Sequence, residues 1–452
     1  MLLVLPHLNC NIFCHYCYEK SYRKQHKTET KSYNLDFILT RMEELRDSYP
    51  GMCLHGGEPL MIGKDDVRRI LFRMKELYGK SSIQTNGVLI DNDFINIFKE
   101  CSTNVGLSHD GPGELSKYRL YKFKNVNLDD KVRAMTKAGV SLSIITVVSK
   151  ANAGTDQLLD KLKAWLLDLH KMNITGRLNP CGGAPGYELS QDRAKEVYLN
   201  LALFCLQHNL KWSPFTDIMH ALQGKSRVCT FMGCDPFCTP SAAELLADGS
   251  VTNCMRLNKE GILLRAPARD YLRNDILSQT SQEFGGCQGC QYWSACQGGC
   301  PGMAINNDWR NRTYLCDVWK ALFQFYDKSL AFCNIQDSSC NNIGGESPCP
   351  PELQSQLKEI APGWTHVDSG NPASPALNLS ASPSPCPPEL QSQLKEIAPG
   401  WTHVDSGSPA SPALNPSASP SPYPPELQSQ LKEIAPGWLH ADSDHIDHAD
   451  HI

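Results

Sequence analysis

No run of apolar residues in this sequence approaches the roughly 20 residues that a membrane-spanning helix needs. The sequence also has little excess of charge, because 43 Lys and Arg stand against 48 Asp and Glu, a formal net charge of -5 at pH 7. A nucleic-acid backbone would therefore find no broad basic field to bind. We expect a globular protein of two or three domains that binds neither membrane nor nucleic acid.

An export signal is also missing from the start of the sequence, where residues 1–10 carry no cationic segment and only a short apolar stretch. We interpret this stretch as the first buried strand. The sequence does contain 20 cysteines. Without export, a cytoplasmic location is expected, and clustered cysteines in that reducing compartment bind metal or perform redox chemistry more often than they form disulfides.

Residues 1–225 alternate short β-rich runs with helical patterns. Such alternation is typical of repeated βα units on a parallel sheet. Six units predict an α/β fold, a partial (β/α)6 TIM-like barrel, with chemistry at the carboxyl ends of the strands. The expected strands lie near residues 2–6, 52–55, 81–85, 104–108, 142–148 and 174–179, and the expected helices include 64–79, 155–170 and 189–208.

Two further segments differ in composition from this first domain. Residues 226–340 are rich in cysteine and have few long periodic stretches, which predicts a small domain organised by metal. Residues 341–452 hold 19 of the 30 prolines, mixed with Ser, Ala, Asn and Gly, and predict a largely disordered, low-complexity tail.

The tail contains an internal repeat. The segment Pro-Pro-Glu-Leu-Gln-Ser-Gln-Leu-Lys-Glu-Ile-Ala-Pro-Gly-Trp starts at Pro350, Pro387 and Pro424, a period of 37 residues. Each copy predicts a short helix that Pro-Gly ends, followed by Trp and a polar segment. A solenoid is an alternative, but one short helix per repeat offers little surface to stack.

Three cysteines follow the first predicted strand in the pattern Cys10-x3-Cys14-x2-Cys17. Three thiolates in so short a loop can hold one iron-sulfur cluster and leave one iron open to a further ligand. A zinc site or chance spacing is the alternative for this motif taken alone.

Unusual residues also end the next three predicted strands. His55-Gly56-Gly57-Glu58-Pro59 combines glycines that let backbone approach a ligand with a carboxylate that can accept an ammonium group. Gln84-Thr85-Asn86-Gly87 and the run from Gly106 to Pro112 end the third and fourth strands. Together with the cysteine motif, these strand ends resemble the radical S-adenosylmethionine (radical SAM) superfamily across residues 1–225.

The resemblance implies that Cys10, Cys14 and Cys17 hold a 4Fe-4S cluster whose open iron binds S-adenosylmethionine (SAM), which is cleaved reductively to a 5′-deoxyadenosyl radical. The Gly56-Gly57-Glu58-Pro59 run would hold the methionyl amino group. Tyr16 would lie near the adenine. The positions expected to contact the ribose or carboxylate are Thr85, Asn86 and Ser108, with Arg119 a further candidate for the carboxylate.

The second set of cysteines has the spacing Cys238-x10-Gly249-x4-Cys254, then Cys287-x2-Cys290-x5-Cys296-x3-Cys300, then Cys316. This spacing is similar to the SPASM domain, an auxiliary-cluster module of radical SAM enzymes that modify peptides and proteins. The resemblance implies two auxiliary 4Fe-4S clusters, three clusters in all. One would be held by Cys238, Cys254, Cys300 and an upstream cysteine, either Cys234, which we favour, or Cys229; the other by Cys287, Cys290, Cys296 and Cys316. A zinc ribbon is the alternative.

One branch of the SPASM enzymes, the anaerobic sulfatase maturases, uses an acidic residue directly after the cysteine that corresponds to Cys254. Met255 stands at that position here, which argues against formylglycine formation. Asp110 is a candidate substitute base, with a structural role as its alternative. Cys181 follows the sixth predicted strand, at the face where a substrate is expected, although a plain packing role is the favoured interpretation.

Another branch crosslinks or epimerises ribosomal peptides behind a leader segment, and the tail repeats have the form of such a peptide. Cys349 and Cys386 precede the first two copies, but Tyr423 precedes the third, so a thioether cannot form in every unit. Aromatic-x-x triplets in the tail resemble substrates of cyclophane-forming radical SAM enzymes. The candidate modified residues are Trp364, His366, Asp368, Trp401, His403, Asp405, Trp438, His440, Asp442, His445, Asp447, His448 and Asp450.

We therefore expect a radical SAM peptide maturase that forms carbon-carbon crosslinks at His-x-Asp or Trp-x-His triplets, acting on its own tail or on a separate precursor peptide. An electron donor such as flavodoxin or ferredoxin would reduce the cluster. Alternatives are thioether formation, epimerisation or sulfatase-type oxidation of another substrate, and a non-catalytic iron-sulfur carrier with a docking tail. For the tail itself, a disordered linker is the alternative.

Overall fold

The computed structural model describes residues 1–20, 33–119, 126–225, 229–231, 233–236, 242–258 and 272–336. Residues 1–330 form one compact unit, and a second unit begins at Ala331. The predicted domain boundaries at 225/226 and 340/341 stay predictions. Cys238 and the whole tail from residue 341, with every residue proposed for modification, lie outside the described residues.

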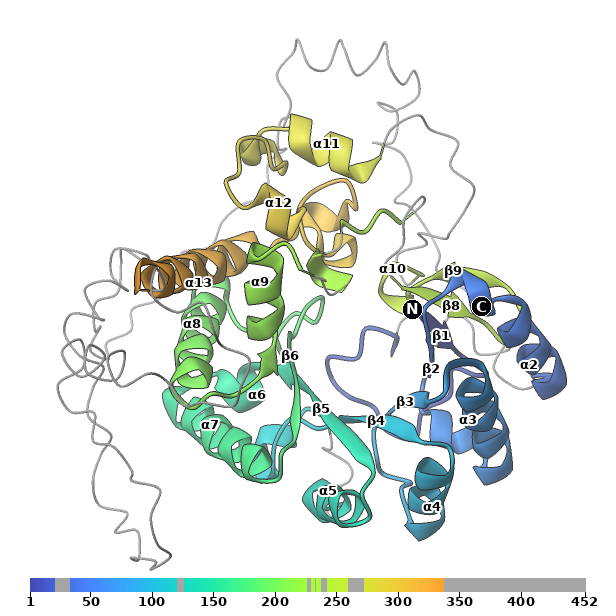
Figure 1. The fold of residues 1–452 in the computed structure, drawn as a ribbon. Helices are drawn as coiled ribbons and strands as arrows, with labels where there is room; N and C mark the ends of the chain where they lie inside the picture. Colours follow the sequence, from blue (N-terminus) through green and yellow to red (C-terminus); the bar gives the residue numbers. More distant parts are fainter. Residues whose placement is uncertain are drawn as a thin grey trace, which may run out of the picture. The chain divides into compact units, whose positions relative to one another are not determined.

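A single sheet of nine strands organises the described residues of the first unit (Figure 1). Its order is β7-β6-β5-β4-β3-β2-β1-β8-β9, so the first seven strands lie side by side in the order of the chain. All pairs are parallel except β8 with β9. The strands are β1 (Leu2–Val4), β2 (Met52–Leu54), β3 (Ser81–Thr85), β4 (Thr103–Ser108), β5 (Ser141–Val148), β6 (Thr175–Pro180), β7 (Trp212–Ser213), β8 (Ala243–Leu245) and β9 (Val251–Asn253).

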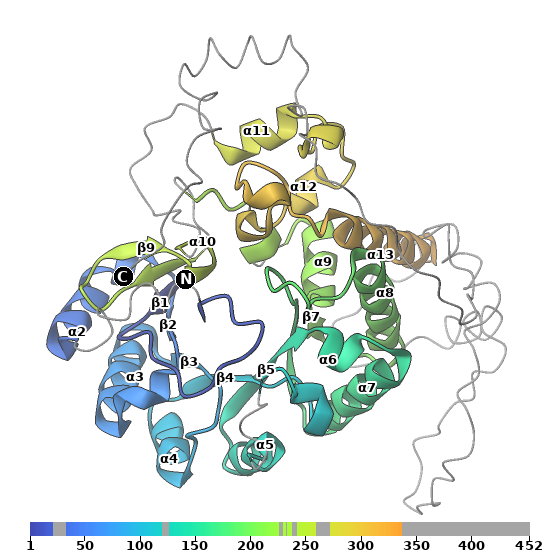
Figure 2. The same cartoon turned by 180° about the vertical axis from the view of Figure 1, so that it is seen from behind.

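Helices connect these strands and lie along the outer side of the curved sheet in both views (Figures 1 and 2). They are α2 (Leu35–Glu44), α3 (Lys64–Tyr78), α4 (Asn92–Glu100), α5 (Leu128–Lys137), α6 (Lys150–Ala153), α7 (Asp156–Lys171), α8 (Gln191–Gln207) and α9 (Phe215–Leu222).

The sequence explains where these helices begin and which face they bury. An Asx or Thr side chain caps the first turn of several of them, as Asp91 does for Phe94 N–H and Thr155 for Leu158 N–H. Helix α3 buries Val67, Ile70 and Met74, which recur at helical spacing. The expected parallel α/β fold is therefore confirmed, with strand limits that move by at most two residues.

Sequence patterns missed three short strands. β7 has two residues, too few for periodicity to register. Strands β8 and β9 form a hairpin in the region expected to be organised by metal, and β8 pairs in parallel with β1. The hairpin thus extends the barrel sheet past its first strand, and it ends one residue before Cys254.

The described part of the cysteine-rich segment has the short helices α10 (Met255–Asn258), α11 (Arg273–Gln279) and α12 (Trp293–Cys296), and then the long helix α13 (Cys316–Gln336). Arg273 is fully buried within it. Its guanidinium donates to the carbonyl oxygens of Trp309 at 2.6 Å, Asn311 at 2.8 Å and Gly299 at 3.1 Å. One charged side chain thus satisfies three carbonyl groups that no strand or helix pairs.

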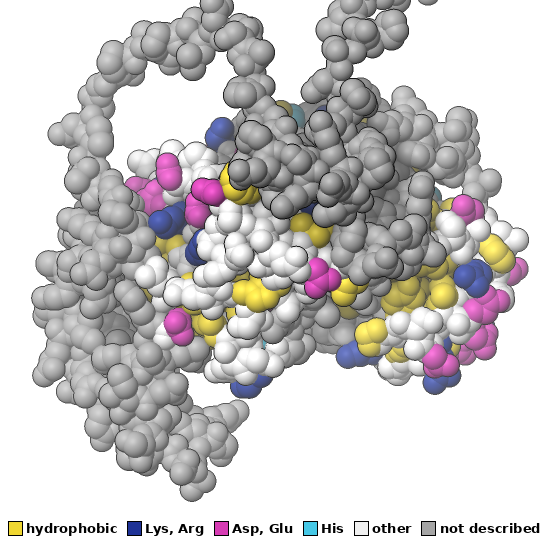
Figure 3. All heavy atoms as spheres, turned by 90° about the horizontal axis from the view of Figure 1, so that it is seen from above, with side chains coloured by type: hydrophobic (Ala, Val, Ile, Leu, Met, Phe, Trp, Pro, Cys, Tyr) yellow, Lys and Arg dark blue, Asp and Glu magenta, His cyan; other side chains and the backbone are white. Residues whose placement is uncertain are grey.

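No helix in the described part of the chain has the length and apolar character required to cross a membrane. On the described part of the face shown in Figure 3, Lys and Arg side chains are interspersed with Asp and Glu. This distribution agrees with the small net charge.

Replacing Arg273 with Met should destabilise the protein because it leaves buried carbonyl groups without donors. We expect a loss of about 3 kcal/mol in the free energy of unfolding. Anaerobic urea denaturation followed by tryptophan fluorescence measures it. The matched control is Arg69→Met, which removes an exposed partner of Asp36 and should leave the midpoint unchanged. Equal midpoints for the two variants would contradict the role assigned to Arg273.

Candidate functional site

The first three cysteines lie in a loop that leaves β1, here called the cysteine loop (residues 9–18). Cys14 is buried, and Cys10 and Cys17 pack beside it against one apolar cluster that includes Ile12 and Tyr16. Burial raises the pKa of the Cys14 thiol to about 12, the charge of Arg119 opposes this shift, and Cys17 and Cys10 add to it. The three thiols therefore lie close enough to influence one another, as ligands of one cluster must.

Two glycines at the end of β2 hold the cysteine loop in place. A Cβ on Gly57 would lie 1.9 Å from the carbonyl oxygen of Asn9, and one on Gly56 would lie 2.8 Å from that of His7. The next residue, Glu58, donates its backbone N–H to the Asn9 carbonyl at 2.7 Å. The sequence predicted that these glycines admit a ligand; in the structure they admit the backbone of the cysteine loop.

The Glu58 carboxylate is fully buried and points into the adjoining strand end. It accepts hydrogen bonds from the Thr85 hydroxyl at 2.6 Å, from Asn86 N–H at 2.7 Å and from Leu60 N–H at 3.1 Å. Burial raises the pKa of Glu58 to about 7, and these donors act against the shift. The carboxylate thus joins the ends of β2 and β3, with Pro59 beginning the short helix that follows.

The side chain of Asn86 reaches the cysteine loop. Its amide nitrogen donates to the Asn11 side-chain oxygen at 2.8 Å and lies 3.8 Å from the Cys10 sulfur. Ser108 ends β4 and is buried. The residues predicted to surround SAM therefore lie together at one edge of the sheet. One of them, Thr85, already donates its hydroxyl to Glu58.

A buried ionic network lies against the same cysteines. Tyr16 donates its hydroxyl to Asp110, and Val147 N–H donates to the other carboxylate oxygen at 2.9 Å. Arg119 donates to Asp110 at 3.2 Å, and its second terminal nitrogen lies 4.0 Å from the Cys14 sulfur. Both oxygens of Asp110 are thus occupied, which supports a structural role and leaves no free oxygen for a substitute base.

Further side chains that the sequence did not assign to the site complete this region. His15, in the cysteine loop, stacks on Tyr187 at 5.0 Å between ring centroids and meets Tyr118 edge-on at 5.9 Å. Cys181 belongs to the same buried cluster as Cys14 and Tyr16. No sequence signal marks the two tyrosines, because they come from loops without periodicity.

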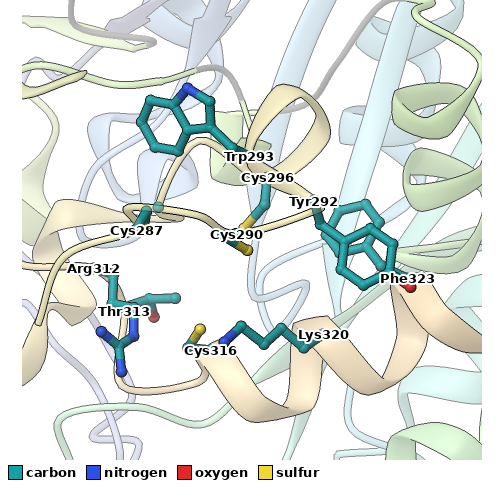
Figure 4. Close-up of a pocket in the computed structure, with 11 residues that line it drawn as sticks. Cys287, Cys290, Tyr292, Trp293, Cys296, Arg312, Thr313, Cys316, Lys320 and Phe323 are labelled. Atoms are coloured by element: carbon teal, nitrogen blue, oxygen red, sulfur yellow. The ribbon is translucent and has the colours of Figure 1, made fainter. Parts of the chain in front are cut away.

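Four of the later cysteines line a single pocket, here called the four-cysteine pocket: Cys287, Cys290, Cys296 and Cys316 (Figure 4). These are the four that the resemblance grouped together. Burial raises the pKa of Cys287 to about 11, and its neighbours Cys316 and Cys290 add to the shift, whereas Arg312 opposes it. In Figure 4, Cys316 and Lys320 come from α13, and the other three cysteines come from α12 and the loop before it.

Four further cysteines of the described residues, Cys229, Cys234, Cys254 and Cys300, gather near the end of β9. Burial, and then the neighbouring Cys300 and Cys229 thiols, raise the pKa of Cys254 well above its usual value. Arg273 donates to the carbonyl oxygens of Cys234 at 3.5 Å and of Gly299 at 3.1 Å, which brings Cys234 beside the residue before Cys300. Both upstream cysteines therefore lie near this group, and the choice between them stays open.

Thiolate donors in these three groups fit iron-sulfur clusters in their chemistry. In the described ranges no group of three or more His, Cys, Asp or Glu side chains is placed to hold a single metal ion. Three observations support this fit to iron-sulfur clusters: four cysteines share one pocket, neighbouring thiols shift one another's pKa, and cations lie beside the cysteines.

A parallel α/β partial barrel with a cysteine loop at its strand ends defines a class of iron-sulfur barrel enzymes. Residues 4–162 match the model of the radical SAM superfamily. This part of the chain is therefore a radical SAM domain, and the protein is an enzyme. This match favours an enzyme over a non-catalytic iron-sulfur carrier.

The chain is also similar to curated and solved proteins. It is 25% identical over 362 residues to a cysteine-type anaerobic sulfatase-maturating enzyme of Clostridium novyi, covering 72% of this chain and 94% of that protein. A solved structure described as a histidine-tagged anSMEcpe with bound AdoMet matches with a TM-score of 0.56 and 19% identity, over 73% of this chain and 97% of the other. A second, described as native anSMEcpe with AdoMet and a Cp18Cys peptide, has a TM-score of 0.55 and 19% identity and covers 74% and 98%. These structural likenesses show the fold.

Substituting Gly57 with Ala should displace the cysteine loop, because the new methyl group would collide with the Asn9 carbonyl. We expect a destabilisation of roughly 1–3 kcal/mol and a loss of the iron bound by this loop, measured by thermal denaturation and by iron analysis after anaerobic reconstitution. Gly51→Ala, just before the same strand, is the control because no atom lies within 4 Å of its added Cβ. Full iron content in Gly57→Ala would show that the loop tolerates the methyl group.

Proposed function

We propose that the protein is a radical SAM peptide maturase with a SPASM-type cysteine-rich domain, and that Cys10, Cys14 and Cys17 hold the cluster that binds SAM. When bound, SAM and the reduced cluster supply the radical that removes a hydrogen atom from the substrate. The observation that carries this proposal is the fixation of the cysteine loop against Gly57, with Arg119 beside Cys14, at the strand ends of a radical SAM domain.

The surrounding residues position this cofactor. Because the Glu58 carboxylate already accepts three hydrogen bonds, the methionyl ammonium group would meet backbone carbonyls of the Gly56–Pro59 run. Asn86 and Ser108 lie where they can contact the ribose or the carboxylate. Arg119, held by Asp110, keeps positive charge beside Cys14 and so favours the thiolate form that binds iron.

The later cysteines would hold two auxiliary 4Fe-4S clusters. The four-cysteine pocket would hold one, with Arg312 and Lys320 as nearby cations. Cys254, Cys300, Cys238 and either Cys234 or Cys229 would hold the other. A low-potential donor such as flavodoxin or ferredoxin would supply electrons, and the expected location is the cytoplasm.

We propose a ribosomal peptide as the substrate, with the protein's own tail as its first candidate. Each crosslink would join a His ring to the β-carbon of the following Asp, or a Trp ring to that of the following His. Each triplet then loses two hydrogens, one as a hydrogen atom from the β-carbon and one as a proton and an electron from the ring, the electron passing to an auxiliary cluster. Three copies of one peptide unit support this choice.

Sulfatase-type oxidation is the second candidate. The relatives over most of this chain are named sulfatase-maturating enzymes, and the match covers 94% of one of them. Met255, which begins α10, takes the place where the maturase pattern has an acid, and Asp110 is occupied by Tyr16 and Arg119. A separate peptide that undergoes thioether formation or epimerisation is a further alternative.

The four-cysteine pocket can be tested by counting iron. After anaerobic reconstitution, Cys287→Ala should lower the iron content from about twelve to about eight atoms per chain, because it removes one ligand of one cluster. Cys205→Ala, a buried cysteine of α8 outside all three groups, is the control and should retain full iron. If both variants hold equal iron, the pocket does not bind a cluster.

The reaction can be tested by tandem mass spectrometry of residues 341–452 after reduction and incubation of the full-length protein with SAM. We expect a loss of two hydrogens per modified unit, located in His-x-Asp or Trp-x-His triplets. Cys14→Ala should show no such loss. An unmodified tail with SAM still cleaved would reject the tail as substrate, and incubation with a cysteine-containing sulfatase peptide then tests the second candidate.

A further inference from the structure

One arginine lies between the cysteine loop and the later cysteines. Arg256 follows Cys254 by two residues, in α10. Its guanidinium carbon lies 4.9 Å from the centroid of the Tyr18 ring, and Tyr18 directly follows Cys17. The side chain therefore connects the cysteine loop with the group that contains Cys254 and Cys300.

Packing fixes the direction of this side chain. A Cβ built on Gly302 would lie 2.5 Å from Cγ and 2.9 Å from Cδ of Arg256, so the stem of the arginine lies directly over that glycine. One terminal nitrogen, Nη1, is shielded from solvent and has no hydrogen-bond partner in the described part of the chain. A guanidinium nitrogen without an acceptor in such a place carries a desolvation cost that a ligand could relieve.

A second donor without an acceptor lies at the end of β6. The Tyr314 hydroxyl is buried and, within the described ranges, has no acceptor for its hydrogen. A Cβ on Gly182 would lie 2.4 Å from this hydroxyl, and the preceding residue, Cys181, packs in one cluster with Cys14. The backbone N–H of Tyr314 donates to the Met303 carbonyl at 2.9 Å, and Met303 directly follows Gly302, over which the Arg256 stem lies. Tyr314 and Arg256 therefore pack against neighbouring residues of one backbone segment.

A charged donor and a hydroxyl donor, both lacking acceptors, fit a group that is anionic and has two oxygens. We propose that Arg256 and Tyr314 bind a carboxylate of the substrate peptide, that of the Asp in a His-x-Asp triplet. This inference rests on the proposed function and deepens it. Holding the carboxylate would fix the adjoining β-carbon, from which the hydrogen atom is removed. It would also explain why the tail places an Asp two residues after a His at five positions.

The test compares two labelled peptides with the sequence of residues 387–407, one with Asp405 and one with Asp405→Asn. Their dissociation constants are measured by fluorescence anisotropy on the reconstituted full chain with SAM bound. We expect the wild-type protein to prefer the Asp peptide by about ten- to a hundredfold. The tail of the chain competes equally with both peptides and leaves this ratio unchanged.

In Arg256→Gln the ratio should fall close to one, and in Tyr314→Phe it should fall part of the way. Arg69→Gln, on the exposed face of α3, is the control and should keep the wild-type ratio. Iron content and the dissociation constant of SAM are measured for each variant. These two measurements separate loss of peptide recognition from loss of a cluster.

Each outcome decides between the two proposals. If Arg256→Gln retains the Asp preference, Arg256 does not bind the carboxylate and only the present inference fails. If Arg256→Gln instead weakens SAM binding, the bound carboxylate belongs to SAM, which also overturns the inference. If the wild-type protein shows no preference for the Asp peptide, the inference fails, and the mass spectrometry of residues 341–452 still decides separately whether the tail is the substrate.

Discussion

The close contact between the cysteine loop and the end of β2 is the constraint on which the site depends. Gly57 leaves no room for a side chain beside the Asn9 carbonyl, and Glu58 uses both its backbone and its carboxylate to connect the loop with β2 and β3. Three thiols with ordinary chain flexibility would lose much conformational entropy on binding one cluster. The parallel sheet reduces that loss, because it fixes the strand ends before any cofactor binds.

The buried Asp110 also fixes the cysteine loop, through its contacts with Tyr16 and Arg119. A lone carboxylate in this position would be strongly disfavoured, but Tyr16, Val147 and Arg119 together satisfy it. In return, Asp110 holds Arg119 beside Cys14 and Tyr16 against the apolar cluster. Asp110 therefore positions Arg119 and Tyr16 beside the cysteine loop.

The sequence predicted the parallel sheet because alternating apolar runs are a local pattern, and the resemblance to the SPASM domain implied the grouping of the four cysteines that share one pocket. The sequence could not predict that the Glu58 carboxylate is occupied by Thr85, or that Gly57 faces the cysteine loop, because these contacts join segments far apart in the chain. The β8–β9 hairpin was missed for a similar reason. Its three-residue strands are specified by pairing with β1 and carry almost no periodicity of their own.

The distribution of cations then links the three cysteine groups to substrate recognition. Thiolates gathered in a low-dielectric interior need positive charge nearby, and each group has it: Arg119 beside Cys14, Arg273 near Cys300, and Lys320 beside Cys316. In the described part of the chain Arg119 also has Asp110, Arg273 has backbone carbonyls and Lys320 has the Gln282 side chain as acceptors. Arg256 has the same relation to Cys254 and Cys300, and in the described part of the chain its Nη1 has no acceptor. Charge compensation alone would not require that free nitrogen, whereas binding of an acidic substrate side chain would.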